Sequence, residues 1–376
     1  MSQNDENVQV ERESVEEDPK RYFSLKYLVI SLTLSAIGMA VVIYYTYTPG
    51  IFEHLAFKRL PGLLIALVVS VMRVWFSAAK IRYLANKEVS WLAAFRIVLV
   101  WDFTSAITPS SIGGAPMATY AMSKENLALG KSTAIILYAM LLDMFWFALV
   151  IPILIVSGFY FAVIPANIGW VGEGVMFVIY FALLTYASLL TYAVLVNPTI
   201  LKKIIKIIFR LPFLRRFRSR MEKEAEILEE TSHELKDKPM SFLFKAFILS
   251  SMSWLCRIWL PTIVVLSFLP ADVVLSFFRS MAMNLAGLFM PTPGGSGGME
   301  GLFALFQGPL MSKKGFIGIS VFMWRLISYY ISIGLGMMAT TWYLNRSVVE
   351  TISDSDEKGD HNEHELANEQ KADLSL

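Results

Sequence analysis

The sequence has few of the residues that soluble enzymes use for catalysis or for covalent cross-links. Cys256 is the single cysteine among 376 residues, so neither a disulfide framework nor a cysteine metal site can form. None of the four histidines stands beside a cysteine, serine or carboxylate at membrane depth in a catalytic spacing. The motifs of zinc peptidases, serine hydrolases and P-loop NTPases are also missing. We therefore expect neither catalysis nor a bound cofactor or metal. We also expect no nucleic-acid partner, because only one basic stretch would suit it.

Charge is scarce as well. Only 17% of the residues are charged, 55% are hydrophobic, and the mean hydropathy is +0.54. These values are too apolar for a soluble domain. Residues 1–20 are polar and acidic and lack the basic start and short apolar core of a cleaved signal peptide. We expect the first apolar run, 27–45, to remain as a membrane anchor.

The apolar residues gather in segments about as long as a bilayer is thick. These segments fall at 26–46, 61–84, 91–112, 131–157, 172–197, 240–269, 272–290 and 316–344. Six of them are long and continuous enough to span a membrane as ordinary helices. The sequence therefore predicts an all-α polytopic membrane protein.

Two segments, 91–112 and 272–290, run straight into the proline- and glycine-rich stretches TPSSIGGAP (108–116) and PTPGGSGGMEG (291–301). Each helix should stop there, because proline lacks an amide donor and glycine adds backbone freedom. Unwound backbone at membrane depth must be buried in protein or face a water-filled cavity. We expect two re-entrant hairpins, and loops at the membrane surface are the alternative.

The topology follows from lysine and arginine in the short connections, which favour the cytoplasmic side. The connection 158–171 has neither residue, whereas 198–223 is dense in both. Basic residues also follow the second segment and flank the first Pro/Gly stretch, namely Lys80, Arg82, Lys87, Lys124 and Lys131. The first hairpin should therefore enter from the cytoplasm and the second from outside. Both termini are expected in the cytoplasm, in a cell inner membrane, although Lys313 and Lys314 then lie outside.

The chain divides into two membrane repeats with polar additions. We expect the repeats at 26–160 and 161–345, and disordered tails at 1–25 and 346–376. Within the second repeat, 198–239 is a basic cytoplasmic loop in which isoleucine, leucine and phenylalanine interleave with lysine and arginine. This pattern suits a helix on an anionic lipid surface. The alternative is that these residues are ordinary basic sequence that flanks a membrane span on its cytoplasmic side.

An Arg-x-Trp pattern relates the two halves. Arg73 and Trp75 recur as Arg257 and Trp259 at an offset of 184 positions (257 − 73 = 184). The same offset, without a gap, superposes the helix-breaking residues of the two Pro/Gly stretches. The superposed pairs are Thr108 and Thr292, Pro109 and Pro293, Gly113 and Gly297, and Gly114 and Gly298. Since the loop charges orient the two Arg-x-Trp helices oppositely, the repeat is inverted, a common plan of secondary transporters.

Ionisable residues at membrane depth supply the candidate substrate site. They are Arg73, Arg257, Arg279, Arg325, Asp102, Asp143 and Glu300. Each costs about 2.5–3.5 kcal/mol at a helix centre, so such residues face a cavity or a partner. Four arginines against three acids leave positive charge over, which suits a phosphate because guanidinium binds it through two hydrogen bonds. Structural pairing is the alternative, with Asp143–Arg325 as the expected pair.

The stretch 108–116 and the run Pro-Thr-Pro-Gly-Gly-Ser-Gly-Gly-Met-Glu at 291–300 resemble the flippase-like family that includes the membrane part of lysylphosphatidylglycerol synthases. The resemblance covers about residues 25–345. It implies the movement of a lipid with an anionic or aminoacylated headgroup between leaflets. It does not imply aminoacylation, because the soluble domain that performs that chemistry is missing. Many relatives carry glutamate after the first Gly-Gly, where this chain has Ala115.

We therefore predict a flippase of an anionic or aminoacylated phospholipid, or of a polyprenyl-phosphate-type lipid, and a homo-oligomer is compatible with the sequence. A membrane enzyme that acts on a phospholipid headgroup and a lipid-binding scaffold remain alternatives. The expected substrate-binding residues are Arg73, Arg257, Arg279, Glu300, Gly113, Gly114, Gly297, Gly298, Asp143 and Arg325.

Overall fold

The computed structural model describes residues 25–50, 60–108, 113–166, 169–197, 199–208 and 218–346. The two predicted tails lie outside the described residues, apart from residues 25 and 346 where they meet the helices. The described part of the chain is helical and has no strand.

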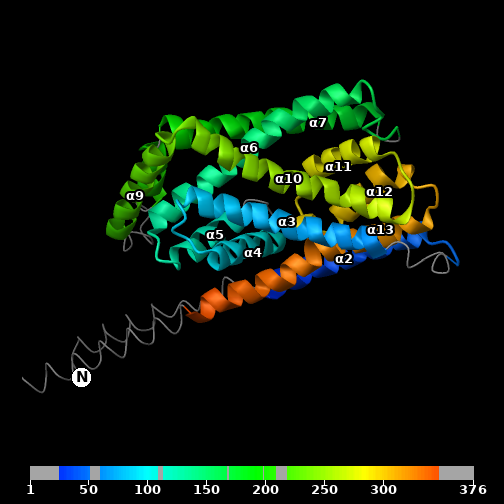
Figure 1. Ribbon diagram of the computed structural model, residues 1–376, viewed down its shortest axis with the longest axis horizontal. Helices are drawn as coiled ribbons and strands as arrows, with labels where there is room; N and C mark the ends of the chain where they lie inside the picture. The colour runs from blue at the N-terminus through cyan, green and yellow to red at the C-terminus, as the bar shows by residue number, and fades with distance from the viewer. Residues whose placement is uncertain are drawn as a thin grey trace, which may run out of the picture.

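Within these residues, six helices are long and apolar enough to cross a membrane. They are α2 (Leu25–Thr46), α3 (Leu60–Leu84), α6 (Leu129–Gly158), α7 (Gly169–Thr191), α10 (Met240–Phe268) and α13 (Gly315–Arg325). The last of these continues through a π-helical turn, η8 (Leu326–Tyr330), to residue 346. The six coincide with the six long apolar segments, so the prediction of an all-α polytopic membrane protein is confirmed (Figure 1).

Both broken segments form hairpins of two short helices. The first consists of α4 (Trp91–Ile107) and α5 (Gly114–Ser123), and the second of α11 (Val273–Gly287) and α12 (Gly298–Gln307). Side chains cap the first limb of each hairpin, since Ala93 N donates to Ser90 Oγ at 3.2 Å and Leu275 N donates to Asp272 Oδ1 at 2.9 Å. With 17 and 15 residues, α4 and α11 are too short to span a bilayer.

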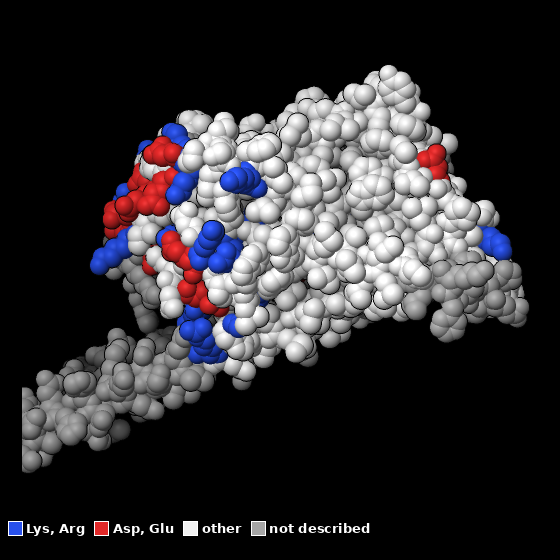
Figure 2. All heavy atoms as spheres, viewed as in Figure 1, with Lys and Arg blue, Asp and Glu red and all other residues white. Residues whose placement is uncertain are grey.

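The two hairpins lie at opposite ends of the molecule. Figure 1 places α4 and α5 toward the end that carries α9 (Arg218–Lys236), and α11 and α12 toward the other end. Charged side chains gather at the α9 end in Figure 2, and the broad middle of this face is nearly free of them. The repeat is visible in the helix bounds. Helices α3 and α10 end at Leu84 and Phe268, 184 positions apart, and α5 and α12 begin and end at the same offset.

The end of α4 and the second break both contact α2. Ser31 Oγ is fully buried, donates to Ala106 O in the last turn of α4 at 2.9 Å, and lies 3.3 Å from Pro293 O in the second break. Further along α2, a Cβ added to Gly38 would lie 2.6 Å from the Cα of Gly297, whose φ of +81° favours glycine. Residues 292–298 of the second break are buried or half-buried, which favours a re-entrant hairpin there over a surface loop. Residues 109–112 of the first break lie outside the described residues.

The basic loop forms two helices, α8 (Thr199–Ile208) and α9, with residues 209–217 outside the described range. Glu229 of α9 joins them, because Thr199 Oγ1 donates to one carboxylate oxygen at 2.6 Å and Lys202 Nζ to the other at 2.9 Å. The hydrogen bond from Thr199, followed by that from Lys202, holds the pKa of Glu229 below its usual value. Helix α9 is tied to α6 by Gly130 N, which donates to Glu224 Oε2 at 2.7 Å.

Candidate functional site

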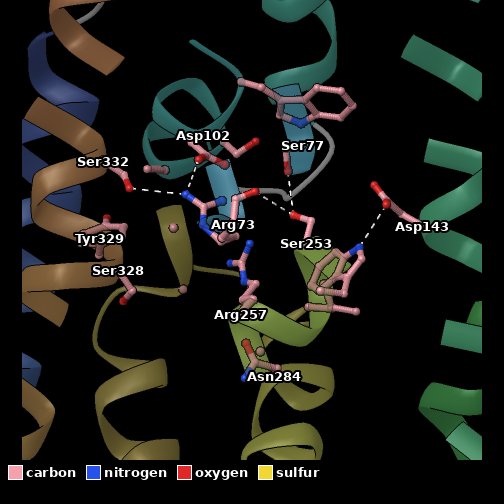
Figure 3. A pocket seen from close by; sticks show the side chains of 18 of the residues that line it. Arg73, Ser77, Asp102, Asp143, Ser253, Arg257, Asn284, Ser328, Tyr329 and Ser332 are labelled. Carbon is pink, nitrogen blue, oxygen red and sulfur yellow. Dashed lines mark hydrogen bonds and ion pairs between the residues drawn. The ribbon is translucent and has the colours of Figure 1, made fainter. Parts of the chain in front are cut away.

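A cavity of about 310 Å³ lies between α3, α4, α6, α10, α13 and the second hairpin break. Six ionisable side chains that belong to membrane helices line it: Arg73, Lys80, Asp102, Asp143, Arg257 and Arg325. Serines 77, 105, 253, 328 and 332 and the backbone of Gly294 and Gly295 complete its polar surface. Figure 3 shows many of these side chains converging on one space from several helices.

Helices α3 and α10 form one wall, packed antiparallel through small hydroxyl residues. Ser77 Oγ lies 2.7 Å from Ser253 Oγ, and Lys80 Nζ lies 3.4 Å from Ser250 Oγ. This register places Arg73 across from position 257, and Figure 3 shows the two arginine side chains facing one another. Small residues allow such close approach between membrane helices. Because the two arginines are equivalents in the repeat, the axis that relates the halves passes between them.

Arg73 is neutralised within its own half. Its Nη2 donates to Asp102 Oδ2 of α4 at 2.7 Å and lies 3.5 Å from Ser332 Oγ. Ser253 Oγ donates to the backbone carbonyl of Arg73 at 3.1 Å. Arg73 is 8% exposed, and its guanidinium is held between Asp102 of the first repeat and Ser332 of the second.

Lys80 and Asp143 form a second pair at 2.7 Å, between α3 and α6. The same carboxylate oxygen accepts hydrogen bonds from Ser250 Oγ and, at 3.0 Å, from Trp254 Nε1. Two predictions are wrong here. Lys80 is buried inside α3 and does not flank it, and the partner of Asp143 is Lys80, not Arg325.

Arg325 pairs instead with Glu300 at the base of the second hairpin. Its Nη2 donates to Glu300 Oε2 at 2.9 Å, and its Nε lies 2.9 Å from Oε1. Glu300 has no exposed surface and also accepts a hydrogen bond of 2.5 Å from Ser35 Oγ of α2. This pair therefore ties α12, α13 and α2 together; Arg325 lines the cavity, and Glu300 lies behind it.

Arg257 differs from the other three cavity cations. It has no acidic partner among the described residues, and the position equivalent to Asp102 in its own half holds Ala286. Its guanidinium carbon lies 5.3 Å from the ring centre of Trp254. The side chain of Arg257 is solvent-accessible although protein surrounds it. Its accessible surface is therefore the part that faces the cavity. The charges within the three ion pairs cancel, so the guanidinium of Arg257 gives the site a net charge of one positive unit.

The remaining predicted residues lie outside the cavity lining. Arg279 donates to the backbone carbonyls of Ala162, at 3.0 and 3.1 Å, and of Phe306, at 3.1 Å, and so fastens loops beyond the end of α6. Gly113, Gly114, Gly297 and Gly298 shape the breaks without lining the cavity, where Gly294 and Gly295 do. No group of three metal-ligating side chains occurs in the described part of the chain.

Sequence reasoning missed the hydroxyl residues that organise the site. Ser77, Ser250 and Ser253 set the register of α3 against α10, and Ser31 joins the two breaks. One signal was available for the wall, because Arg73, Ser77 and Lys80 recur at the spacing of one helix face. Ser31 carries no such signal, since its partners are distant in sequence.

Comparison with known proteins identifies relatives over the whole cavity. A family model described as the lysylphosphatidylglycerol synthase TM region matches residues 27–336. A UPF0104 membrane protein of Archaeoglobus fulgidus is 25% identical over 335 residues, which cover 84% of this chain and 96% of that protein. No solved structure matches the chain. Every residue that lines the cavity falls within the matched range.

Proposed function

The chain belongs to the lysylphosphatidylglycerol synthase transmembrane-region family, as its Pro/Gly stretches predict, and we propose that it moves a phosphate-bearing lipid between the leaflets of a membrane. The cargo is an anionic or aminoacylated phospholipid, or a polyprenyl-phosphate-type lipid, because all of these share the phosphate that the site can recognise. The family description, which names a lipid-modifying enzyme's membrane part, supports a lipid as the cargo.

The single observation that carries this proposal is the uncompensated Arg257. An unpaired charge at membrane depth costs about 2.5–3.5 kcal/mol on insertion scales, so it is retained where it has a ligand. Guanidinium presents a fork of donors that matches two phosphate oxygens, and the Trp254 ring lies beside it, 5.3 Å from the guanidinium carbon. A lipid phosphate in the cavity would therefore supply the negative charge that Asp102 supplies to Arg73.

The inverted hairpins support movement over mere binding. One hairpin reaches the cavity from each end of the molecule, the first through the end of α4 and the second through its break. In transporters built from inverted repeats, exchanging the conformations of the two halves exposes a central site to one side and then to the other. The same exchange here would present Arg257 to each leaflet in turn.

We also propose that the α9 end faces the cytoplasm of an inner membrane, which places both termini there. The concentration of basic residues at that end supports this orientation. A membrane-impermeant maleimide tests it on Lys236→Cys and Lys313→Cys, each in a Cys256→Ala background. Both positions are exposed, and labelling of both from the same side would overturn the orientation.

The function is tested by lipid movement in vesicles that contain the purified protein. Fluorescent phospholipid and polyprenyl-phosphate analogues are followed by reduction of the outer-leaflet dye. We expect Arg257→Met to lower the rate at least tenfold, and Arg257→Lys to retain part of it because the charge remains. Lys245→Met is the matched control, since it removes an exposed positive charge from the same helix, away from the cavity.

Each outcome decides between the candidate functions. Movement that is lost in Arg257→Met and kept in Lys245→Met supports the transporter. If the unmodified protein moves no analogue but alters one chemically, the transporter hypothesis fails and the membrane-enzyme hypothesis takes its place. If it binds lipid without moving or altering it, and binding is equal in both variants, a scaffold replaces it.

A further inference from the structure

Helix α8 is the only described segment outside the membrane spans that combines exposed isoleucine with unpaired lysine. Ile204, Ile207 and Lys203 are exposed, and Lys206 is half-buried. These side chains play no part in the cavity. A short helix that exposes large apolar side chains to water loses stability unless another phase covers them.

We propose that α8 is a second lipid-binding site, which docks on the anionic headgroup surface of its own leaflet. Ile204 and Ile207 enter the boundary between headgroups and acyl chains, and Lys203 and Lys206 bind the headgroup phosphates. This site is independent of the lipid movement proposed above.

Position along the chain holds α8 at the membrane surface. The preceding span ends in the turn η4 (Tyr192–Val196), and α8 begins at Thr199. Three residues of extended chain reach at most about 11 Å. The start of α8 therefore lies within about 11 Å of the end of that span.

The contacts of α8 divide its surface into an inner and an outer side. Thr199 and Lys202 meet Glu229 of α9, and Lys202 also lies 3.6 Å from Glu226. Leu201 packs against the protein core. Ile204 and Ile207 are three positions apart and so share a side, opposite Lys202. Protein thus occupies the inner side and leaves the isoleucines without a protein neighbour to cover them.

Charge complementarity identifies the occupant of the outer side. The acids of α9 that reach α8 are both used on Lys202. Lys203 and Lys206 have no acidic partner in the described part of the chain. Unpaired lysines beside exposed isoleucines match anionic lipid phosphates above acyl chains, whereas a zwitterionic surface offers no net attraction.

An environment-sensitive fluorophore at position 207 tests the proposal in the full chain. The protein carries Ile207→Cys and Cys256→Ala, and is placed in nanodiscs of phosphatidylcholine alone or with one third phosphatidylglycerol. We expect a blue-shifted emission and protection from aqueous iodide only with phosphatidylglycerol. Raising the salt from 0.1 to 1 M should reduce both effects, because the Debye length falls from about 10 to about 3 Å.

Charge reversal separates the lysines from the rest of the surface. The double change Lys203→Glu and Lys206→Glu should abolish the response to phosphatidylglycerol, whereas Lys236→Glu on α9 should leave it intact. A second probe, at Ile204→Cys, must report the same pattern. Equal protection in both lipids, exposure in both, or a response that survives the double reversal would each overturn the proposal. Lipid movement is measured on the same samples, and its loss alone leaves this inference unaffected.

Discussion

Two arginines in the same cavity should respond oppositely when their charge is removed. Arg325 is 3% exposed and bonded to the fully buried Glu300, whereas Arg257 is accessible and has no acidic partner among the described residues. Methionine preserves much of the arginine stem in both places. We therefore expect Arg325→Met to destabilise the protein and Arg257→Met to stabilise it.

The magnitudes follow from what each change leaves behind. Arg325→Met leaves the carboxylate of Glu300 buried with one hydrogen bond, from Ser35. Breaking a buried pair in this way costs about 3–5 kcal/mol. Arg257→Met removes an unpaired cation whose burial costs up to about 3 kcal/mol. Because its guanidinium is open to the cavity, we expect a gain well below that full cost, about 1 kcal/mol.

Equilibrium unfolding in mixed micelles measures both changes, with the nine tryptophans as the fluorescent reporter. The double variant Arg325→Met with Glu300→Gln completes a thermodynamic cycle, and it should recover part of the loss because no unpaired charge remains. A loss of stability in Arg257→Met as large as that in Arg325→Met would refute the distinction between a paired structural arginine and a free binding arginine.

Two further predictions concern the supports of the site. Gly38→Ala should lower the free energy of unfolding by about 1–3 kcal/mol in the same assay, because its Cβ would press on the backbone of Gly297; Gly301→Ala, which meets no atom within 4 Å, should cost nothing. The contact of Glu229 with Thr199 should weaken in acid. Its folded pKa is lowered, so its contribution is present above the unfolded pKa and is lost as the pH falls through the folded value. The protection factors of the α8 amides, which divide out the intrinsic pH dependence of hydrogen exchange, should fall from pH 6 to pH 3, and Glu229→Gln should remove that pH dependence.

The helices and their breaks could be predicted because both depend on local sequence. Apolar length fixes the spans, and proline and glycine fix where α4 and α11 end. The repeat was also readable, since its offset of 184 positions reproduces the ends of α3 and α10. These features need no knowledge of which helices meet.

The ion pairs could not be predicted, because they depend on packing. Lys80 lies four residues before the end of α3, and counting charges along the chain therefore assigned it to the flanking loop. Only the register of α3 against α10 places it inside, beside Ser250 and Asp143. The partner of Arg325 is likewise fixed by the return of α12 to the same end as the start of α13.

The free state of Arg257 was, by contrast, within reach of the sequence. The offset that relates the arginines also relates Asp102 to Ala286, so one half keeps its counter-ion and the other has lost it. This asymmetry gives the cavity its function as proposed. With acids in both halves the cavity would be neutral, and with neither it would hold two facing guanidinium groups at high electrostatic cost. One acid leaves one cation beside the axis of the repeat, where either half can deliver a single phosphate to it.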